Sequence, residues 1–262
     1  MCFNRKHYIR YMCFVQTDYA PNFFVFFWFF LDKLLYNQIM GTKVYLSDSM
    51  IQVYNSEGSG EKKVLYFLAA EPVEIAPPPA MCVVMVYPYE WSLMMTPWKY
   101  SGSGVRGMET TGGGKEYAES FQREIMEKAE SLFGFHVTGR GIAGYSLGGI
   151  EALYMASINH DFGNFEFVGS VSGSFWYEGT VQYFGGHDLP GVHKAYVSIG
   201  RKETGKAGTE RAMVRANTEE VVRILQRSID VTYEINSGGH FSNIPERMEK
   251  CANCWKNVEK VI

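Results

Sequence analysis

The greater part of the chain alternates short apolar runs with longer amphipathic stretches. Residues 43–46 and 50–54 are short runs with alternating apolar and polar positions, and a Gly- and Ser-rich turn follows at 55–60. This pattern predicts two antiparallel strands. Residues 64–69 and 82–87 are almost continuously apolar, which is typical of strands that are buried on both faces.

Further along, strand-like runs alternate with helical ones. Apolar residues recur at helical spacing between 116 and 133, which predicts a helix there. The other expected strands are 141–145, 165–171, 195–199 and 231–235, and the other expected helices are 147–158, 209–227 and 245–261. Two irregular stretches, 88–114 and 172–194, separate these elements. Buried strands that alternate with helices predict an α/β fold, with a mostly parallel sheet covered by helices on both faces.

The first 39 residues differ from the rest. Seven of the eleven residues 21–31 are aromatic, and charged residues flank this run on both sides. The uncharged run is shorter than the ~20 residues that a membrane-spanning helix needs, and no small-residue cleavage site follows it. Three interpretations of 1–39 stay open: a translated stretch upstream of a true start at Met40, a membrane or targeting anchor, or a packed segment. We expect 40–262 to form one catalytic domain without an internal repeat or linker.

Composition narrows the class of protein. The chain has 262 residues, of which 46% are hydrophobic and 20% charged, with a formal net charge of −3. This is a globular composition without the basic excess of a nucleic-acid-binding protein. The five cysteines are few and odd in number, which argues against a disulfide scaffold and favours a reducing, cytoplasmic compartment. Cys251 and Cys254 lack a second ligand pair for zinc, so we expect free thiols.

The sharpest motif is Gly144-Tyr145-Ser146-Leu147-Gly148, a G-x-S-x-G sequence. The bare pattern is weak, but here it follows a predicted strand and runs directly into a predicted helix. Such a strand-turn-helix elbow exposes a serine hydroxyl above the sheet, and its glycines leave room for the neighbouring strand and helix. We therefore expect Ser146 to be a nucleophile.

A serine nucleophile needs a base and an acid. In the α/β-hydrolase order the acid and then the histidine follow the serine, on loops after later strands. His240 comes directly after the predicted strand 231–235, and Glu203 follows the strand 195–199. Asp188 and Asp230 precede their strands and are less well placed. The predicted catalytic residues are therefore Ser146, Glu203 and His240.

An oxyanion formed during ester cleavage needs two N–H donors. The first is expected from the backbone of Leu147, directly after the nucleophile. The second is expected at the end of strand 64–69, from the backbone of Ala70 or Glu71. Because only backbone is needed, side-chain identity constrains the second donor weakly.

The two irregular stretches are expected to wall the pocket. They contain three tryptophans that either bind substrate or pack the fold: Trp91, Trp98 and Trp176. Basic residues beside Trp98 and beside the proposed acid either bind an anionic substrate or are ordinary solvated charges: Lys99, Arg106, Arg201, Lys202 and Lys206. We select Trp98, Trp176 and Arg106 as the candidate substrate-binding residues.

Four segments together resemble the putative esterase (esterase D-like) family of α/β-hydrolases, with the look of enterochelin-esterase-like proteins. They are residues 144–149, 172–177, 200–203 and 239–240, and 87–98 adds to the likeness. The resemblance covers about 43–258 in patches and implies the same three catalytic residues. Family members often carry Asp-Gly where this chain has Ala70-Glu71, which leaves the second oxyanion donor open. The resemblance also implies catechol siderophores or related aryl esters as substrates.

Together these features predict a serine carboxylic-ester hydrolase that acts on a small-molecule ester and requires no metal or cofactor. Two alternatives stay open: an acyltransferase of the same fold, and a non-catalytic binding protein that kept the fold. No nucleic-acid partner is expected. Membrane association is expected only if 1–39 is a real anchor, and the sequence leaves the oligomeric state open.

Overall fold

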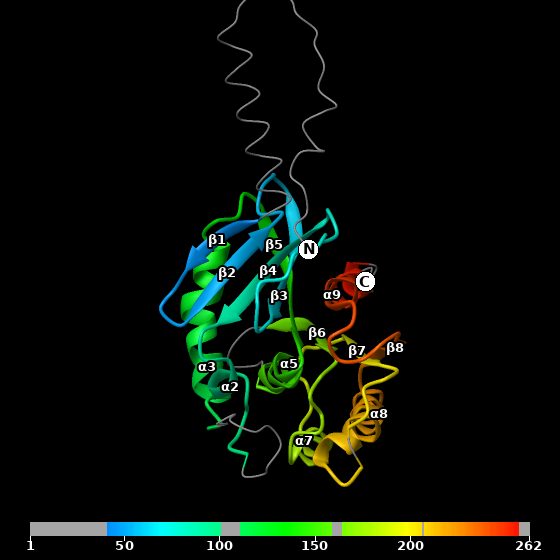
Figure 1. Ribbon diagram of the computed structural model, residues 1–262. Helices are drawn as coiled ribbons and strands as arrows, with labels where there is room; N and C mark the ends of the chain where they lie inside the picture. The colour runs from blue at the N-terminus through cyan, green and yellow to red at the C-terminus, as the bar shows by residue number, and fades with distance from the viewer. Residues whose placement is uncertain (1–40, 101–110, 159–163, 206, 257–262) are drawn as a thin grey trace, which may run out of the picture. The chain divides into compact units, whose positions relative to one another are not determined.

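A single eight-stranded sheet organises the described part of the chain (Figure 1). The computed structural model describes residues 41–100, 111–158, 164–205 and 207–256. In these ranges the strands are β1 (Thr42–Tyr45), β2 (Ser49–Tyr54), β3 (Glu61–Leu68), β4 (Met81–Pro88), β5 (His136–Tyr145), β6 (Phe165–Val171), β7 (Lys194–Gly200) and β8 (Asp230–Asn236). Their order across the sheet is β1-β2-β4-β3-β5-β6-β7-β8.

The strand directions confirm the predicted fold class. β1 pairs antiparallel with β2, and β2 pairs antiparallel with β4. All other pairs, from β4–β3 through to β7–β8, are parallel. The turn at 55–60 does not close a hairpin, because β3 lies beyond β4 and beside β5. The mostly parallel sheet with this strand order is the α/β-hydrolase fold.

The helices follow the predicted alternation with three differences. The expected helix at 116–133 begins earlier and contains a π-helical turn in its middle. The stretches 88–114 and 172–194 each contain a helix that we did not predict. The first has only four residues, and the second is short and ends in two glycines, so both carry little apolar periodicity. The helical segments are α2 (Trp91–Met94), α3 (Gly114–Ser120), η2 (Phe121–Met126), α4 (Glu127–Glu130), α5 (Leu147–Ser157), α7 (Thr180–Gly186), η3 (Glu210–Met213), α8 (Val214–Leu225) and α9 (Ile244–Lys256).

Helices cover both faces of the sheet. In β3, Val64, Tyr66 and Leu68 join a core with α3, α5 and α8, whereas Leu65 and Phe67 join a second core with α9. This alternation is the period-two pattern of a strand, and apolar residues on both faces explain why β3 and β4 read as continuous apolar runs. Because β5, β6, β7 and β8 run parallel, they end at the same edge of the sheet, and the loops that follow them meet there.

The interpretations of residues 1–39 fall outside the described residues, and so do the candidates Arg106 and Lys206. Within the part of the chain that is described, none of the helices combines the length and apolar character needed to cross a membrane.

Candidate functional site

The G-x-S-x-G motif forms a tight elbow between β5 and α5. Ser146 has φ 61° and ψ −120°, a backbone conformation that a non-glycine residue rarely adopts. The turn is so tight that a Cβ added at Gly144 would lie 2.1 Å from the carbonyl oxygen of Gly148. Only glycine fits there, and the elbow leaves the Ser146 hydroxyl half-exposed at the start of α5.

The structure brings Ser146, His240 and Glu203 into one hydrogen-bonded chain. His240 Nε2 lies 3.0 Å from Ser146 Oγ, and His240 Nδ1 lies 2.8 Å from Glu203 Oε2. With the imidazole proton on Nδ1, Glu203 accepts from His240 and Nε2 accepts from the Ser146 hydroxyl. The three side chains come from the loops after β5, β8 and β7, as the chain order predicted.

Glu203 is a buried carboxylate with several donors. Its Oε1 atom accepts hydrogen bonds from the Ser172 hydroxyl and from the Gly200 N–H, both at 2.7 Å. Burial raises the pKa of Glu203, but the hydrogen bonds from His240, Ser172 and Gly200 outweigh it and hold the pKa below its ordinary value. Glu203 is therefore ionised at neutral pH and places a negative charge beside the imidazole.

Two further side chains surround the serine and the histidine. Ser174 Oγ lies 3.1 Å from Ser146 Oγ, so the serine oxygen has a second hydroxyl neighbour besides His240. The Tyr145 hydroxyl donates to the backbone carbonyl of His240, and burial raises the pKa of this phenol. Tyr145 therefore stays neutral and anchors the histidine's loop.

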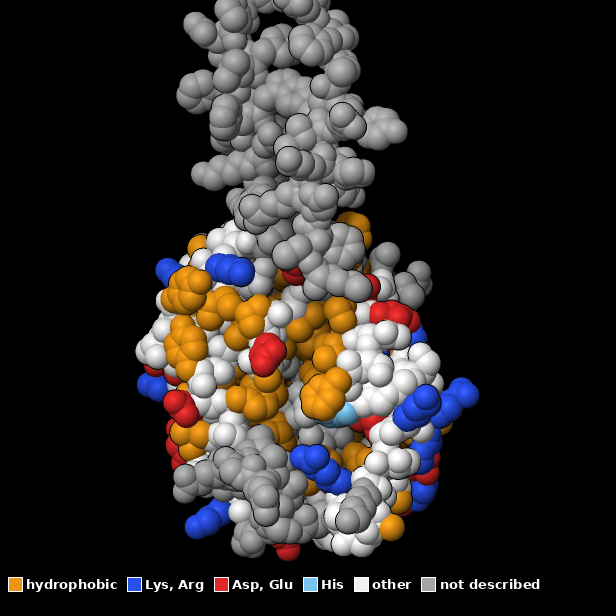
Figure 2. All heavy atoms as spheres, viewed as in Figure 1, with side chains coloured by type: hydrophobic (Ala, Val, Ile, Leu, Met, Phe, Trp, Pro, Cys, Tyr) orange, Lys and Arg blue, Asp and Glu red, His pale blue; other side chains and the backbone are white. Residues whose placement is uncertain are grey.

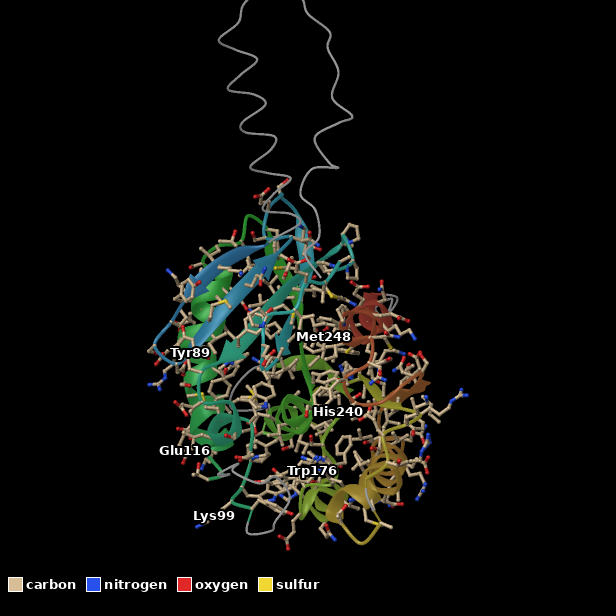
Figure 3. The ribbon with its side chains drawn as sticks, viewed as in Figure 1. Tyr89, Lys99, Glu116, Trp176, His240 and Met248 are labelled. Carbon is tan, nitrogen blue, oxygen red and sulfur yellow. The ribbon has the colours of Figure 1, made fainter. Side chains whose placement is uncertain are left out.

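The serine and the histidine open into a cleft of about 1110 Å³. Figure 2 shows apolar side chains gathered in the middle of this face, with basic side chains below them and around the rim of the face. In Figure 3 His240 lies between Met248 and Trp176, and all three line the cleft. The apolar part of the lining comes mainly from Ala69, Pro72, Val73, Trp91, Leu147, Val214, Phe241, Ile244 and Met248. A cleft of this size and character suits an organic small molecule.

Both expected backbone donors lie at the cleft. Leu147 is the first residue of α5, so its N–H has no acceptor one turn earlier in the helix. Ala70 and Glu71, which come shortly after β3, also line the cleft. The N-terminus of α5 adds a partial positive charge there, so the cleft favours negative charge close to Ser146.

The three tryptophans fall in two different environments. Trp91 and Trp176 line the cleft. Trp98 does not: its indole N–H donates to the Glu178 carbonyl at 2.7 Å, and its ring packs against Tyr183 with ring centres 5.0 Å apart. Trp98 is thus a packing residue in the structure, because its polar atom and its ring are both engaged within the fold.

The basic candidates also differ in whether they line the cleft. Lys202 lines the cleft, whereas Arg201 and Lys99 are outside its lining. Arg211, which the sequence analysis did not select, lies at the cleft with its guanidinium carbon 5.3 Å from the centre of the Trp176 ring. An arginine over an aromatic ring is a cation–π contact, so one wall of the cleft combines an aromatic surface with positive charge.

The sequence analysis also missed Arg247, which contacts Glu203 from α9. A signal was available. The buried face of α9 includes Met248, Cys251, Ala252 and Trp255, and Arg247 lies four residues before Cys251 on the same stripe. A charged residue on an apolar stripe is buried only when it is paired, so the pattern of α9 predicts an acidic or polar partner for Arg247.

The family comparison matches most of the chain. Residues 48–232 match the model of the family described as "Putative esterase". Among curated proteins, "Uncharacterized protein YbbA" of Bacillus subtilis (strain 168) is 29% identical over 138 residues, which is 50% of this chain and 53% of that protein. The chain thus matches about half the length of this relative.

Solved structures share the fold at low sequence identity. The siderophore hydrolase EstA from Aspergillus nidulans aligns with a TM-score of 0.64 and 15% identity over 84% of this chain and 95% of that one. The enterobactin esterase FES from Shigella flexneri aligns with a TM-score of 0.60 and 16% identity over 84% of this chain and 60% of that one. These likenesses show the α/β-hydrolase fold, and the family match over residues 48–232 shows that this chain belongs to the putative esterase family.

Proposed function

We propose that this protein is a serine carboxylic-ester hydrolase that works through an acyl-enzyme on Ser146. One observation carries the proposal: Ser146, His240 and Glu203 line the cleft and form a continuous hydrogen-bonded chain, with contacts of 3.0 and 2.8 Å. A serine beside an oriented imidazole and an ionised carboxylate is the arrangement that activates a hydroxyl for acyl transfer. Family membership points to the same chemistry.

The first half-reaction forms the acyl-enzyme. His240 Nε2 takes the proton of the Ser146 hydroxyl as Oγ attacks the ester carbonyl carbon. The carbonyl oxygen becomes an oxyanion, for which the Leu147 N–H and the backbone N–H of Ala70 are the proposed donors. His240 then gives its proton to the leaving alkoxide, and the alcohol departs. Throughout, Glu203 stabilises the positive charge on the imidazole.

The second half-reaction releases the acid. His240 removes a proton from a water molecule, whose oxygen attacks the acyl carbon. The tetrahedral intermediate collapses, Ser146 Oγ leaves, and His240 returns the proton to it. The products are a carboxylic acid and the regenerated serine, so the residues of this chain supply every proton transfer.

The cleft favours an aryl ester with negative charge near the aromatic group. Trp176 offers a flat surface, Arg211 places positive charge over its ring, and Lys202 adds a second basic residue to the lining of the cleft. Two structurally similar proteins are described as a siderophore hydrolase and an enterobactin esterase. We therefore extend the proposal to siderophore-like or related aryl esters, because such ligands combine aromatic rings with anionic oxygens.

A cytoplasmic location is also part of the proposal. Cys82, Cys251 and Cys254 are free thiols, and the first two are buried. Thiols persist in this form in reducing compartments.

Ester turnover by Ser146→Ala tests the proposed reaction. The variant removes the nucleophile and should lower kcat by about 10⁴-fold or more on a nitrophenyl ester. Ser174→Ala is the matched control, because it deletes a hydroxyl 3.1 Å away and keeps the nucleophile; it should stay within about tenfold of the wild type. Turnover by Ser146→Ala within tenfold of the wild type would contradict the assignment.

The substrate class is tested by Arg211→Met. The variant should raise KM for a ferric catecholate trilactone and leave KM for a neutral nitrophenyl ester almost unchanged. Lys99→Met is the control, because Lys99 is exposed and lies outside the cleft lining. High salt should shrink the preference for the anionic ester. Equal effects of Arg211→Met on both esters would refute the aryl-anion preference and leave the general esterase proposal intact.

A further inference from the structure

Arg247 is the most deeply buried cation of the described residues that contacts the proposed catalytic side chains. Only 1% of its side chain is exposed, and it lies in the first turns of α9. Burying a guanidinium in a protein core is costly unless charged and polar partners satisfy it. Packing of α9 alone therefore does not explain why a guanidinium is buried there.

Four hydrogen bonds use the two ends of the guanidinium fork. Nη1 donates to Glu203 Oε1 at 3.0 Å and to Ser172 Oγ at 2.8 Å. Nη2 donates to the carbonyl oxygens of Ser237 at 2.8 Å and Gly239 at 3.0 Å. These partners lie in the loops after β6, β7 and β8, so one side chain joins three of the loops that form the cleft.

At the Nη1 end, the two oxygens of the Glu203 carboxylate have different partners. Oε1 receives Arg247, the Ser172 hydroxyl and the Gly200 N–H, whereas Oε2 receives His240 Nδ1. With Oε1 held by three donors, the carboxylate cannot rotate away from the imidazole. The close fit extends to the backbone, because a Cβ at Gly200 would lie 2.7 Å from both Arg247 Nη2 and Glu203 Oε1.

The second end holds the loop that carries the histidine. The Gly239 carbonyl belongs to the peptide bond that leads into His240, so fixing it fixes the backbone from which the imidazole projects. Ser237 is fixed in the same way at the start of the loop. On the other side, the Tyr145 hydroxyl binds the His240 carbonyl. Arg247 thus holds both Glu203, the proposed acid, and the loop of His240, the proposed base.

We propose that Arg247 is a positioning residue for catalysis: it holds Glu203 and the His240 loop in register, so that the 2.8 Å contact between the carboxylate and the imidazole is formed before substrate binds. This inference rests on the esterase function proposed above. A lysine cannot replace the fork, because a single ammonium cannot reach two loops in the planar geometry of a guanidinium.

The same contact affects how activity depends on pH. The titratable groups that face the Glu203–Arg247 pair are His240, Tyr145 at the end of β5 and Glu234 in β8. Tyr145 stays neutral because burial raises its pKa, and Lys250 neutralises Glu234 at 2.6 Å. Removing Arg247 leaves the buried Glu203 without its cation, so the carboxyl should take up a proton at a higher pH.

The test compares Arg247→Met and Arg247→Lys with a control on another arginine–glutamate pair. Arg140 contacts Glu130 through two hydrogen bonds of 2.7 Å, outside the cleft. Arg140→Met therefore removes an arginine of similar pairing without touching the loops of the site. For each protein, kcat and KM are measured against pH, and the fold is checked by circular dichroism. Proton NMR follows the far-downfield N–H signal of the His240–Glu203 hydrogen bond.

Arg247→Met should lower kcat by about 10²-fold with a much smaller change in KM, since small displacements of catalytic groups have effects of this size. Its acid limb should move to higher pH, and the downfield signal should disappear. Arg247→Lys should recover part of the activity, and Arg140→Met should match the wild type in kcat, acid limb and signal. If Arg247→Met does not fold, the lysine variant decides, and wild-type kcat and acid limb in it would overturn the proposal.

The NMR signal separates this inference from the proposed function. If the wild type cleaves no ester, the esterase proposal fails, but loss of the signal in Arg247→Met or its weakening in Arg247→Lys still supports the positioning role. A folded Arg247 variant that keeps the signal and the wild-type kcat overturns the inference and leaves the esterase function standing.

Discussion

Glu203 and Glu151 are both buried glutamates, yet their surroundings keep the first ionised and the second neutral. Glu203, at the edge of the sheet, accepts hydrogen bonds from Ser172, Gly200, His240 and Arg247, and its pKa lies below the ordinary value. Glu151, in α5, has no hydrogen-bond partner for either carboxylate oxygen among the described residues. Burial raises its pKa well above the ordinary value. The carboxylate beside the cleft is thus charged, and the one beneath α3 is neutral.

The difference shows what distinguishes a working carboxylate from one that is merely enclosed. Burial alone favours the neutral form, and donors arranged around the group reverse that preference. At Glu203 the donors come from several loops that meet at one edge of the sheet. At Glu151 the packing is close, because a Cβ added at Gly114 would lie 2.3 Å from Oε2, and none of the described residues donates to the carboxylate.

The largest expected effect is on activity at Glu203. Glu203→Gln keeps the shape of the side chain and removes the charge that stabilises the imidazolium. We expect kcat to fall by about 10³- to 10⁴-fold with a smaller change in KM. Glu130→Gln is the control, because Glu130 also has a lowered pKa but lies outside the cleft, and its activity should match the wild type. If Glu203→Gln were nearly silent, the acid would have to be sought elsewhere, at Asp188 or Asp230.

The next effect is on stability at Glu151. Glu151→Leu removes two buried oxygens that find no hydrogen-bond partner in the described part of the chain, and it keeps apolar volume in α5. We expect the free energy of unfolding to rise by about 1–3 kcal/mol, measured by urea denaturation, with ester turnover almost unchanged. A large loss of activity in a folded Glu151→Leu protein would show that the two glutamates are not functionally distinct.

The smallest effect is a difference in pH dependence. The folded pKa of Glu203 is lowered from 4.5, so its contribution to stability is present above 4.5 and is lost as the pH falls below it. The folded pKa of Glu151 is raised above 4.5, so the unfolded state loses its proton first and stability falls as the pH rises from 4.5. Each slope approaches about 1.4 kcal/mol per pH unit for one proton.

Denaturation at several pH values measures both slopes. The advantage of Glu151→Leu over the wild type should grow above pH 4.5, whereas the wild type should lose stability relative to Glu203→Gln as the pH falls below 4.5. Parallel stability curves for all three proteins would contradict an ionised Glu203 and a neutral Glu151.

The sequence predicted the elements that depend on local patterns. Apolar runs identified β3 to β8, and the glycines around Ser146 identified the elbow, because both follow from backbone geometry over a few residues. Chain order then selected Glu203 and His240, which the structure places in contact. The helix α7 was missed because its residues are short of apolar periodicity, and the place of β3 beyond β4 depends on pairing that no local pattern encodes.

The rest of the site depends on contacts between distant residues. Arg247 and Ser172 are 75 positions apart, and Arg211 contacts the Trp176 ring on one wall of the cleft. Trp98 and Trp176 both lie in stretches without a regular pattern. Only the fold shows that the first packs within the protein and the second lines the cleft. Such contacts are set by the positions of loops in space, so residue type and spacing alone could not select among the candidates.

Fluorophosphonate labelling measures the central claim most directly, because the probe reacts with an activated serine and requires no knowledge of the substrate. The wild type should gain one probe adduct per chain, mapped by mass spectrometry to Ser146, and His240→Ala should label far more slowly. Glu151→Leu should label at the wild-type rate. A wild-type protein that remains unlabelled at Ser146, or that labels equally fast without His240, would contradict the account.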